Sequence, residues 1–506
     1  MNIFKKNILF LSVLTLTLLF QLSSAEFGHL TILYVNDTHE HILPDTQDGA
    51  EIGGLARMAT LVKEIMSEEK NVIFLHAGDH ITGSVFSSIY HGKVDVLCFN
   101  YMGLTASAVG NHEFDDGFNN LLDNLSKFAK FPFLSANVVY SDTSAKFGVV
   151  YPWSSSTETE VGDFGMPILI YGLTTPNTPI QTNPDNVKGL IFEDPYKVSE
   201  NLMKTWYSKY PVIIALTHLG LSDDKMLASS VNGIDVIIGG HSHDFIYKPD
   251  KVNNTIICQA GQYGWYLGRI DIVFDKNGEV IDYTNKLYKI TSEIKDDEGL
   301  LTELKPYIEE VEGFSSQIIC SLDFILGAET DVTRASETNL GDLLTDVMRF
   351  STNTDVAIIN SGGIRATINP PKITVGDIMK ALPFNNNIVV CKLSGVDLLN
   401  AFKWGYENQM GSGGFPQISG AKVIIASDGK IERVFIGDES LDKNKVYKIA
   451  TVNFLISGGD GYTMFANAKE IIDTGLYTTD LVITYLKDKG NVPAPVMNRV
   501  IVRWEK

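Results

Sequence analysis

Five short apolar runs in the first half of the chain end in residues that bind metals. The runs are LTILYVND, VIFLHAGD, ASAVGNHE, VIIALTH and VIIGGHSH. Their length and composition are typical of buried strands. Carboxylates, imidazoles and an amide are ligands for divalent transition metals. The polar residues at or just after these ends are Asp37, His39, Asp79, Asn111, His218, His241 and His243.

The segments between these runs predict how the ligands meet. Apolar periodicity predicts helices over residues 55–69, 118–129 and 196–209, so strands and helices alternate. In an open α/β sheet the carboxyl ends of the strands face one crevice. A single Asp-x-His or Gly-Asp is most often an ordinary turn. Five such ends in one layered domain predict a site for two divalent metals.

Each residue type suits a part in phosphoester hydrolysis. Asp79 stands alone at its strand end and suits a carboxylate that bridges two cations. Two cations about 3.5–4 Å apart activate a water for attack on phosphorus. With so many imidazoles, zinc is expected first, with manganese, cobalt or iron as alternatives. His112 is free to face the substrate, and either Asp115 or Glu113 suits a partner that holds its ring.

Length and charge limit the classes of protein. At 506 residues the chain is too long to fold around a single compact core. We expect a first α/β domain over residues 26–290, a helical connector over 291–319 and a smaller α/β domain over 320–506. The chain has 41 basic and 61 acidic residues, a net charge of −20, which argues against a nucleic-acid partner. An anionic small substrate remains compatible, because metals and arginines invert the local field.

The first 25 residues have the features of a cleaved export signal. Lys5 and Lys6 precede an apolar run over residues 8–20, and small residues follow at 23–25. The alternative is a retained membrane anchor, for which this run is short. The charged end of the sequence lacks the apolar tail of a lipid-anchor signal. We therefore expect a secreted protein, extracellular or periplasmic, without a stable membrane anchor.

The four cysteines leave two alternatives open. Cys98, Cys258, Cys320 and Cys391 are spaced too widely for a metal-binding or redox motif. Export would permit disulfides, in three alternative sets of pairs. Buried free thiols are the equal alternative.

The second half of the chain carries four motifs rich in polar residues and glycine. They are RASETNLGD over residues 334–342, NSGGIR over 360–365, LPFN over 382–385 and NFLISGGDGY over 453–462. Singly, each has an ordinary explanation: a phenylalanine in a core, a glycine-rich turn or a solvated arginine. Together and in this order they are far more specific.

The whole set of motifs resembles the 5'-nucleotidase family of calcineurin-type metallophosphoesterases, over essentially all of the chain after residue 25. The resemblance implies a four-layer αββα sandwich for the first domain. It implies a catalytic pair, His112 with Asp115, which favours Asp115 over Glu113. The ligands implied for the first metal are Asp37, His39, Asp79 and His243. Those implied for the second are Asp79, Asn111, His218 and His241.

The same resemblance assigns substrate contacts to the second domain. Arg334, Asn360 and Arg365 would hold the phosphate and ribose region, and a guanidinium fork suits phosphate oxygens. Phe384 and Phe454 would stack on the two faces of the base, worth about 1–3 kcal/mol and tolerant of base identity. Asp460 would bind the ribose hydroxyls.

The implied activity is hydrolysis of nucleoside 5'-monophosphates such as AMP. Relatives in the family cleave UDP-sugars, or act on ATP and ADP as apyrases, so both remain alternatives. A secreted nucleotide-binding protein without catalysis is the remote alternative. Family members rotate their domains to admit substrate. Thr333 and Thr338 flank Arg334 where some animal enzymes have cysteines, so that disulfide is not expected. Their membrane anchor is not expected either, because the lipid-anchor signal of those enzymes is missing here.

Overall fold

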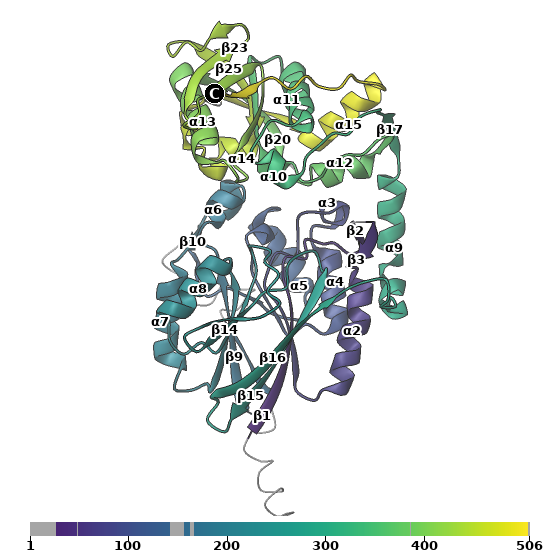
Figure 1. Cartoon of the computed structure of the whole chain (residues 1–506), viewed down its shortest axis with the longest axis vertical. Helices are drawn as coiled ribbons and strands as arrows, with labels where there is room; N and C mark the ends of the chain where they lie inside the picture. The colour runs from purple at the N-terminus through teal and green to yellow at the C-terminus, as the bar shows by residue number, and fades with distance from the viewer. Residues whose placement is uncertain (1–26, 48, 142–155, 162–165, 385, 504–506) are drawn as a thin grey trace, which may run out of the picture.

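A computed structural model describes residues 27–47, 49–141, 156–161, 166–384 and 386–503. Two α/β domains follow one another along the long axis, with the C-terminal domain above the N-terminal one in Figure 1. Residues 1–25, the predicted export signal, lie outside the described residues. Within the described part, no helix has both the length and the apolar character needed to cross a membrane.

The N-terminal domain contains two six-stranded sheets that pack face to face. The first has the order β16 (Val280–Lys289), β15 (Tyr266–Asp275), β1 (Phe27–Val35), β4 (Val72–His76), β5 (Ala106–Ala108) and β6 (Phe133–Leu134). The second has the order β13 (Asp250–Val252), β14 (Thr255–Cys258), β12 (Val236–Gly239), β11 (Val212–His218), β9 (Met166–Thr174) and β8 (Ser156–Val161). In the first sheet β1, β4, β5 and β6 are parallel, and in the second β14, β12, β11 and β9 are parallel. Each of the other strands pairs with its neighbours in antiparallel fashion.

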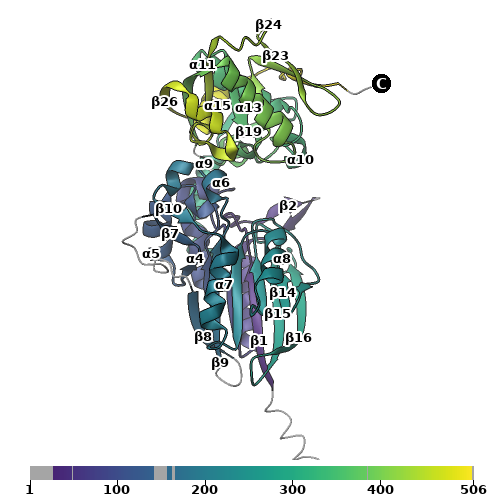
Figure 2. The ribbon, with the colours of Figure 1, turned by 90° about the vertical axis from the view of Figure 1, so that its left-hand side faces the viewer.

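Helices cover the outer face of each sheet and complete four layers, αββα (Figures 1 and 2). On the first sheet lie α2 (Leu55–Glu68), α3 (Val85–Tyr90) and α4 (Lys93–Met102), and on the second α7 (Pro195–Trp206) and α8 (Leu221–Ser230). A strand covered on both faces is apolar throughout, which explains continuous runs such as VIIALTH, where every residue of β11 is buried. The predicted sandwich is confirmed.

One predicted helix differs from the structure. The segment expected to be a helix over 118–129 begins as a π-helical turn, η2 (Asn120–Leu125), and ends in the short α5 (Ser126–Phe128). Leu121 and Leu125 remain buried in the core, so the apolar periodicity that suggested a helix is still used. The wider turn is not visible in that periodicity.

Short elements connect the strands on the side that faces the C-terminal domain and on the flanks. They are β2 (Asp45–Gln47), β3 (Ala50–Ile52), η1 (His112–Phe114), β7 (Val138–Tyr140), α6 (Thr178–Gln181), η3 (Pro184–Val187) and β10 (Leu190–Phe192).

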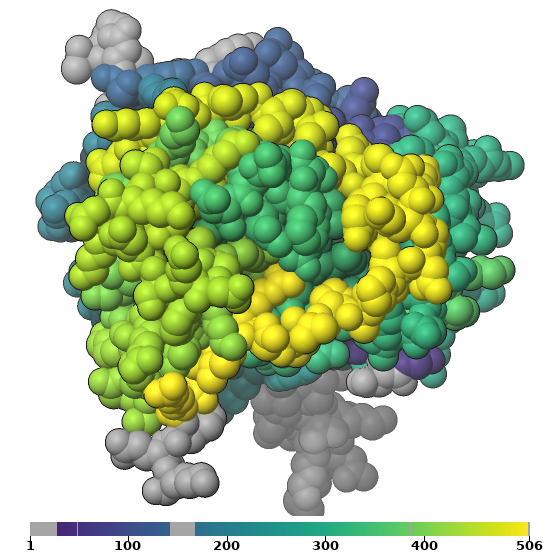
Figure 3. Space-filling model, turned by 90° about the horizontal axis from the view of Figure 1, so that it is seen from above, coloured from purple at the N-terminus to yellow at the C-terminus, as the bar shows by residue number. Residues whose placement is uncertain are grey.

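The C-terminal domain is the smaller α/β unit that the sequence predicts. Its five-stranded sheet has the order β21 (Pro416–Ser419), β18 (Val356–Asn360), β25 (Val446–Val452), β20 (Asn387–Ser394) and β26 (Lys469–Tyr477). Beside it lies a second sheet of β24 (Glu439–Ser440), β23 (Ile431–Ile436), β22 (Ala421–Ile425) and β27 (Val500–Val502). The main helices are α11 (Asn339–Thr352), α13 (Gly395–Asn408) and α15 (Thr478–Lys489). Seen from above, this domain covers most of the molecule (Figure 3).

Smaller elements of the C-terminal domain surround the substrate motifs. They are β17 (Ile318–Ser321), α10 (Thr330–Thr333), η4 (Ser361–Gly363), β19 (Lys372–Thr374), α12 (Val375–Ala381), α14 (Asn453–Ile456), η5 (Gly459–Gly461) and η6 (Thr463–Asn467).

A long helix, α9 (Glu298–Ser315), runs along one side of the molecule between the domains (Figure 1). Its first residues are fixed to the N-terminal domain, because Asp297 caps the helix and accepts hydrogen bonds from Lys63 and Tyr101. Next in the chain, β17 pairs with β19 of the C-terminal domain. The helix lies within the predicted connector, while the domain limits themselves stay predictions.

All four cysteines are buried free thiols. Burial raises the pKa of Cys258 and Cys391 to about 12, so these thiols are held in the neutral form. Of the two alternatives left open by the sequence, the structure has the second.

Candidate active site between the two domains

The strand ends bring the predicted metal ligands together in two adjacent groups. In the first group, His243 Nε2 lies 3.2 Å from Asp37 Oδ1 and 3.3 Å from His39 Nε2. In the second, His218 Nε2 lies 2.9 Å from Asp79 Oδ2, and His241 is close to both. The structure also groups Asp79 with His39 and His112, so this carboxylate lies close to a residue of the first group as well.

The backbone at these ligands is strained. Left-handed φ angles are uncommon for residues with a side chain and tend to cluster at functional sites. Here they occur at Asp37 (51°), His39 (51°), Asp79 (63°), His241 (76°) and His243 (57°). Strands do not need left-handed residues at their ends. Five of them at the predicted ligands therefore indicate that the placement of these side chains determines the conformation of the loops.

Two glycines let the loops approach each other. A Cβ atom on Gly110 would lie 2.1 Å from Asp79 Oδ1, and one on Gly78 would lie 2.8 Å from both Gly110 N and His218 Nδ1. Gly78 also has a φ of +90°, which favours glycine. The strand ends at β4 and β5 can therefore meet only with glycine at both positions.

The residues present fit divalent cations. The buried Oδ1 of Asn111 has no hydrogen-bond partner among the described residues, which suits a neutral oxygen ligand. Burial lowers the pKa of His241 to about 4 and that of His39 well below its ordinary range, so both offer neutral imidazoles. Burial alone would also lower the pKa of His218, but Asp79 raises it to about 10. The same attraction favours a cation at this place.

His112 and Asp115 form the pair that the sequence predicts. His112 Nδ1 lies 2.5 Å from Asp115 Oδ2, which fixes the ring, and the His112 backbone N–H donates to Asp79 Oδ1 at 2.9 Å. Burial alone would lower the pKa of His112, but the carboxylates of Asp115 and Asp79 raise it to about 9. Because Nδ1 faces Asp115, the other ring nitrogen of His112, Nε2, is available to contact a group bound in the cavity.

Glu113 has a separate role from the one considered for it in the sequence. Its carboxylate accepts backbone N–H groups from Asp79 (3.0 Å), His80 (2.6 Å) and Gly110 (2.5 Å). It thus ties the β4 end to the β5 end and points away from the His112 ring. In a glutamine at this position, the side-chain NH₂ group would face backbone N–H groups that now donate to the Glu113 carboxylate.

We expect Glu113→Gln to lower the free energy of unfolding by about 2 kcal/mol, because hydrogen bonds to a charged group are worth about 1.5–3 kcal/mol. Urea unfolding measures this. Glu310→Gln is the control, since the Glu310 carboxylate accepts a hydrogen bond at an exposed site from Tyr90 alone among the described residues. Equal stability of the two variants would contradict a stabilising role for the hydrogen bonds that join the β4 and β5 ends through Glu113.

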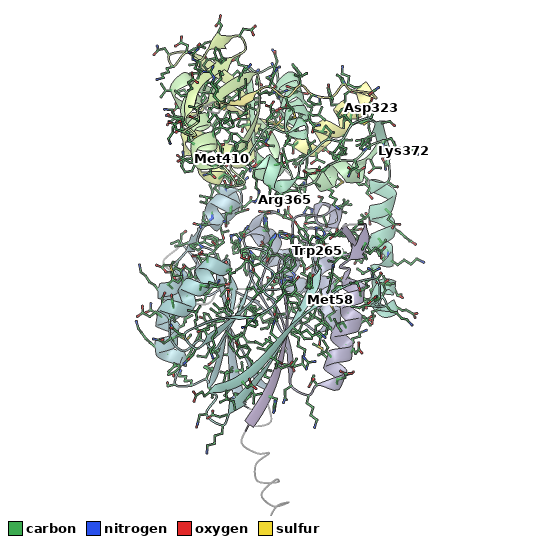
Figure 4. All side chains as sticks on the ribbon, in the orientation of Figure 1. Met58, Trp265, Asp323, Arg365, Lys372 and Met410 are labelled. Atoms are coloured by element: carbon green, nitrogen blue, oxygen red, sulfur yellow. The ribbon has the colours of Figure 1, made fainter. Side chains whose placement is uncertain are left out.

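The C-terminal domain presents the predicted substrate residues to the same cleft. A cavity of about 1360 Å³ lies between the domains, and Arg365 faces the N-terminal domain at its edge (Figure 4). The ring of His112 lies 6.1 Å from that of Phe384, and the Arg365 guanidinium lies 5.8 Å from the Phe384 ring. Predicted site residues from both domains line the cavity: Asp79, Asn111, His112, Asp115, His241, His243, Arg334, Asn360, Arg365, Phe384, Phe454 and Asp460. Asp37, His39 and His218 lie beneath that lining, fully buried.

Asp460 is fixed at the cavity wall. Asn360 Nδ2 donates to its carboxylate at 2.8 Å, and Trp404 Nε1 donates to its carbonyl at 2.8 Å. Burial raises the pKa of Asp460 to about 6, although Asn360 and the Arg334 charge oppose this. The residue before Asp460 lies close to an aromatic ring, because a Cβ atom on Gly459 would lie 2.5 Å from the Phe454 side chain.

Several cavity residues were not predicted from the sequence. Tyr263 stacks on His41 with ring centroids 4.0 Å apart and lines the cavity, as does Trp404. Thr182 and Asn186 hold Asp115 from a separate loop, and Gln181 contacts His241. Trp404 lies on α13, and the others lie in short turns or short helices without ligand spacing, so the sequence carried no signal for their place in the cavity.

Comparisons with known proteins agree with this arrangement. A family model described as calcineurin-like phosphoesterase matches residues 30–245, and one described as 5'-nucleotidase, C-terminal domain, matches residues 319–467. The 5'-nucleotidase of Diplobatis ommata is 30% identical over 97% of this chain and 92% of its own length. The trifunctional nucleotide phosphoesterase protein YfkN of Bacillus subtilis is 33% identical over 92% of this chain, which spans 34% of that longer protein.

A solved structure extends the likeness to three dimensions. The 5'-nucleotidase precursor of Thermus thermophilus superposes with a TM-score of 0.83 at 32% identity, over 94% of this chain and 100% of that one. Sequence and fold therefore agree over nearly the whole chain: it is a phosphoric monoester hydrolase and belongs to the 5'-nucleotidase family.

Proposed function

We propose that this hydrolase removes phosphate from nucleoside 5'-monophosphates such as AMP and uses two divalent cations, with zinc as the first candidate. The observation that carries the proposal is the division of one cavity between two domains. The side chains proposed to bind metal, together with His112 and Asp115, form its lower wall, and arginines with aromatic rings form its upper wall. A phosphate joined to a flat heterocycle matches both walls.

The N-terminal domain supplies the chemical half of the site. When bound, two cations would neutralise phosphate charge and supply an activated water. We propose that Asp37, His39, Asp79 and His243 hold one cation and that Asp79, Asn111, His218 and His241 hold the other. His112, oriented by Asp115, donates a hydrogen bond to the phosphoryl oxygens, whose charge grows in the transition state.

The C-terminal domain supplies recognition. Arg334 and Arg365 bind phosphate oxygens, and Asn360 lies beside them. Phe384 and Phe454 stack on the base, which tolerates different bases. Asp460, whose carboxylate accepts from Asn360 and lines the cavity, suits acceptance of the ribose hydroxyls.

A second candidate is a longer substrate such as a UDP-sugar, ADP or ATP. A cavity of about 1360 Å³ exceeds the ordinary range of small-molecule pockets, which is about 300–1000 Å³. The Bacillus subtilis relative carries the name of a trifunctional nucleotide phosphoesterase, which is compatible with several substrates for one architecture.

We also propose that the protein is secreted after removal of residues 1–25. The composition of those residues supports this, and relatives 30% identical to this chain are named snake venom 5'-nucleotidases. The proposed limits of the two domains, 26–290 and 320–506, contain the segments matched by the two family models, except for residue 319 at the start of the second match.

Phosphate release by purified residues 26–506 tests the proposal. AMP, ATP, 3'-AMP and UDP-glucose would be compared after EDTA treatment and after return of zinc, manganese, cobalt or magnesium. UDP-glucose needs a coupled phosphatase, because cleavage of its pyrophosphate frees no phosphate. We expect metal-restored hydrolysis of AMP and little of 3'-AMP. Silence on every substrate with two metals bound would favour a nucleotide-binding protein instead.

A further inference from the structure

The segment over residues 178–187, here called the brace, contacts both halves of the proposed catalytic apparatus. It comprises α6, residues 182 and 183, and η3. Neither the ligand motifs nor the substrate motifs include any part of it. Its contacts with Asp115 and His241 carry an inference that rests on the proposed function.

Thr182 anchors the carboxylate that orients His112. Its hydroxyl donates to Asp115 Oδ1 at 2.8 Å, on the oxygen opposite the one that contacts His112. From the same segment, Asn186 Nδ2 donates to the Asp115 backbone carbonyl at 2.6 Å. Thr182 is only 1% exposed, so water cannot readily replace its hydroxyl. Thr82, outside the brace, donates to Asp115 Oδ2 at 2.8 Å, so the brace holds the other carboxylate oxygen and the main chain of Asp115.

Gln181 contacts a proposed metal ligand. Its Nε2 lies 3.2 Å from His241 Nε2, while its buried Oε1 has no hydrogen-bond partner among the described residues. Amide oxygen and nitrogen atoms exchange places by a half-turn. After that turn Oε1 accepts a hydrogen bond from His241 Nε2–H, and the other ring nitrogen stays free for a cation. An imidazole that binds a metal commonly donates its second N–H in this way.

The brace also touches the C-terminal domain. α6 packs against η5, which contains Asp460, and Ser457 Oγ lies 3.4 Å from Asp185 Oδ2. In both ribbon views α6 lies directly beneath the upper domain (Figures 1 and 2). The residues that hold Asp115 and His241 are thus directly connected to a surface that meets the recognition domain.

We infer that the brace is a positioning element, in which Thr182 orients Asp115 and Gln181 orients His241 through its amide oxygen. Thr182 acts on the His112–Asp115 pair, and Gln181 acts on one metal position. Neither touches the reacting atoms. Each has its own test, because one affects turnover and the other affects metal binding.

Thr182→Val removes the hydroxyl and keeps the shape. We expect kcat for AMP to fall about tenfold with KM unchanged, as for loss of other partners that orient a catalytic group, and Thr182→Ser to restore it. Thr178→Val is the matched control, since Thr178 is equally buried but its hydroxyl donates only to Thr175 O. An equal loss in Thr178→Val, or none in Thr182→Val, would overturn the inference for Thr182.

A double variant separates positioning from general damage. If Thr182 acts through His112, then Thr182→Val should have no further effect on kcat in a His112→Ala background. A second loss of the same size in that background would show a structural effect and would refute positioning.

Gln181 is tested by metal affinity in the purified full-length protein, a readout independent of turnover. We expect Gln181→Leu to weaken zinc binding at one of two positions about tenfold or more, while Gln181→Glu, which keeps an acceptor, retains it. Weakened binding in Gln181→Glu would mean that the amide donates to His241, contrary to the inference. If the wild-type protein hydrolyses no nucleotide but the Gln181 variants behave as expected, the proposed function fails and this part of the inference stands.

Discussion

Asp79→Asn is expected to leave at most one of two metals bound and to lower kcat by a factor on the order of 10³. Asp79 is grouped with His218 and His241 on one side and with His39 and His112 on the other, and its Oδ2 lies 2.9 Å from His218 Nε2. An amide lacks the negative charge that holds two cations close together. The rate estimate follows from several kcal/mol of metal-dependent stabilisation, at about 1.4 kcal/mol per factor of ten.

The measurement is metal stoichiometry by elemental analysis, together with AMP turnover. Asp116→Asn is the matched control: it removes a carboxylate from the same cavity, but Asp116 pairs with His91 at 2.9 Å and belongs to neither ligand group. Metal content should be unchanged in that control. Two metals and full activity in Asp79→Asn would show that another group bridges the cations.

The residues predicted to bind metal lie close together in the structure, and the sequence could predict this proximity for a physical reason. Asp79 and His218 follow or end strands that are buried on both faces, and such strands are visible as unbroken apolar runs. Parallel strands of one sheet share a carboxyl edge, which brings the ends of β1, β4 and β5 together in one sheet and those of β11 and β12 together in the other. The packing of the two sheets face to face, which the strand order alone does not give, brings the two edges together. Neither step required knowledge of loop conformation.

Partners that depend on loop conformation were beyond such reasoning. Thr182 lies 67 positions from the Asp115 carboxylate to which it donates, on a turn without periodicity. Glu113 and Asp115 stood as alternatives to hold His112 until the family resemblance favoured Asp115. In the structure the tight 3₁₀ turn η1 directs Glu113 to backbone N–H groups and Asp115 to the imidazole. A spacing of one or three residues from His112 does not decide between them.

The relative position of the domains was also beyond the sequence. Phe384 and Phe454 were assigned to base stacking through resemblance, whereas composition alone would have placed them in a core. Phe454 is in fact 9% exposed and packs against Gly459, so it is at once a core residue and part of the cavity wall. Only the arrangement of two domains around one cavity distinguishes these readings.

The second large effect is expected at His112. His112→Ala should lower kcat for AMP about 10²–10³-fold, the usual loss when one preorganised donor to a developing charge is removed, with both metals retained. The backbone N–H that donates to Asp79 Oδ1 at 2.9 Å survives the substitution, so the ligand loop keeps its tie. Asp115→Asn should cost less, because the ring remains while its orientation and charge are less well fixed.

His91→Ala is the matched control for His112→Ala, since His91 also pairs with an aspartate, Asp116, at 2.9 Å near the same cavity. It should leave kcat unchanged. The structure also places His112 within reach of His39 and Asp79, in a group able to hold a metal. Metal analysis therefore decides its role: loss of one metal in His112→Ala would make His112 a ligand, whereas two retained metals with lost turnover would make it the group that contacts the phosphate.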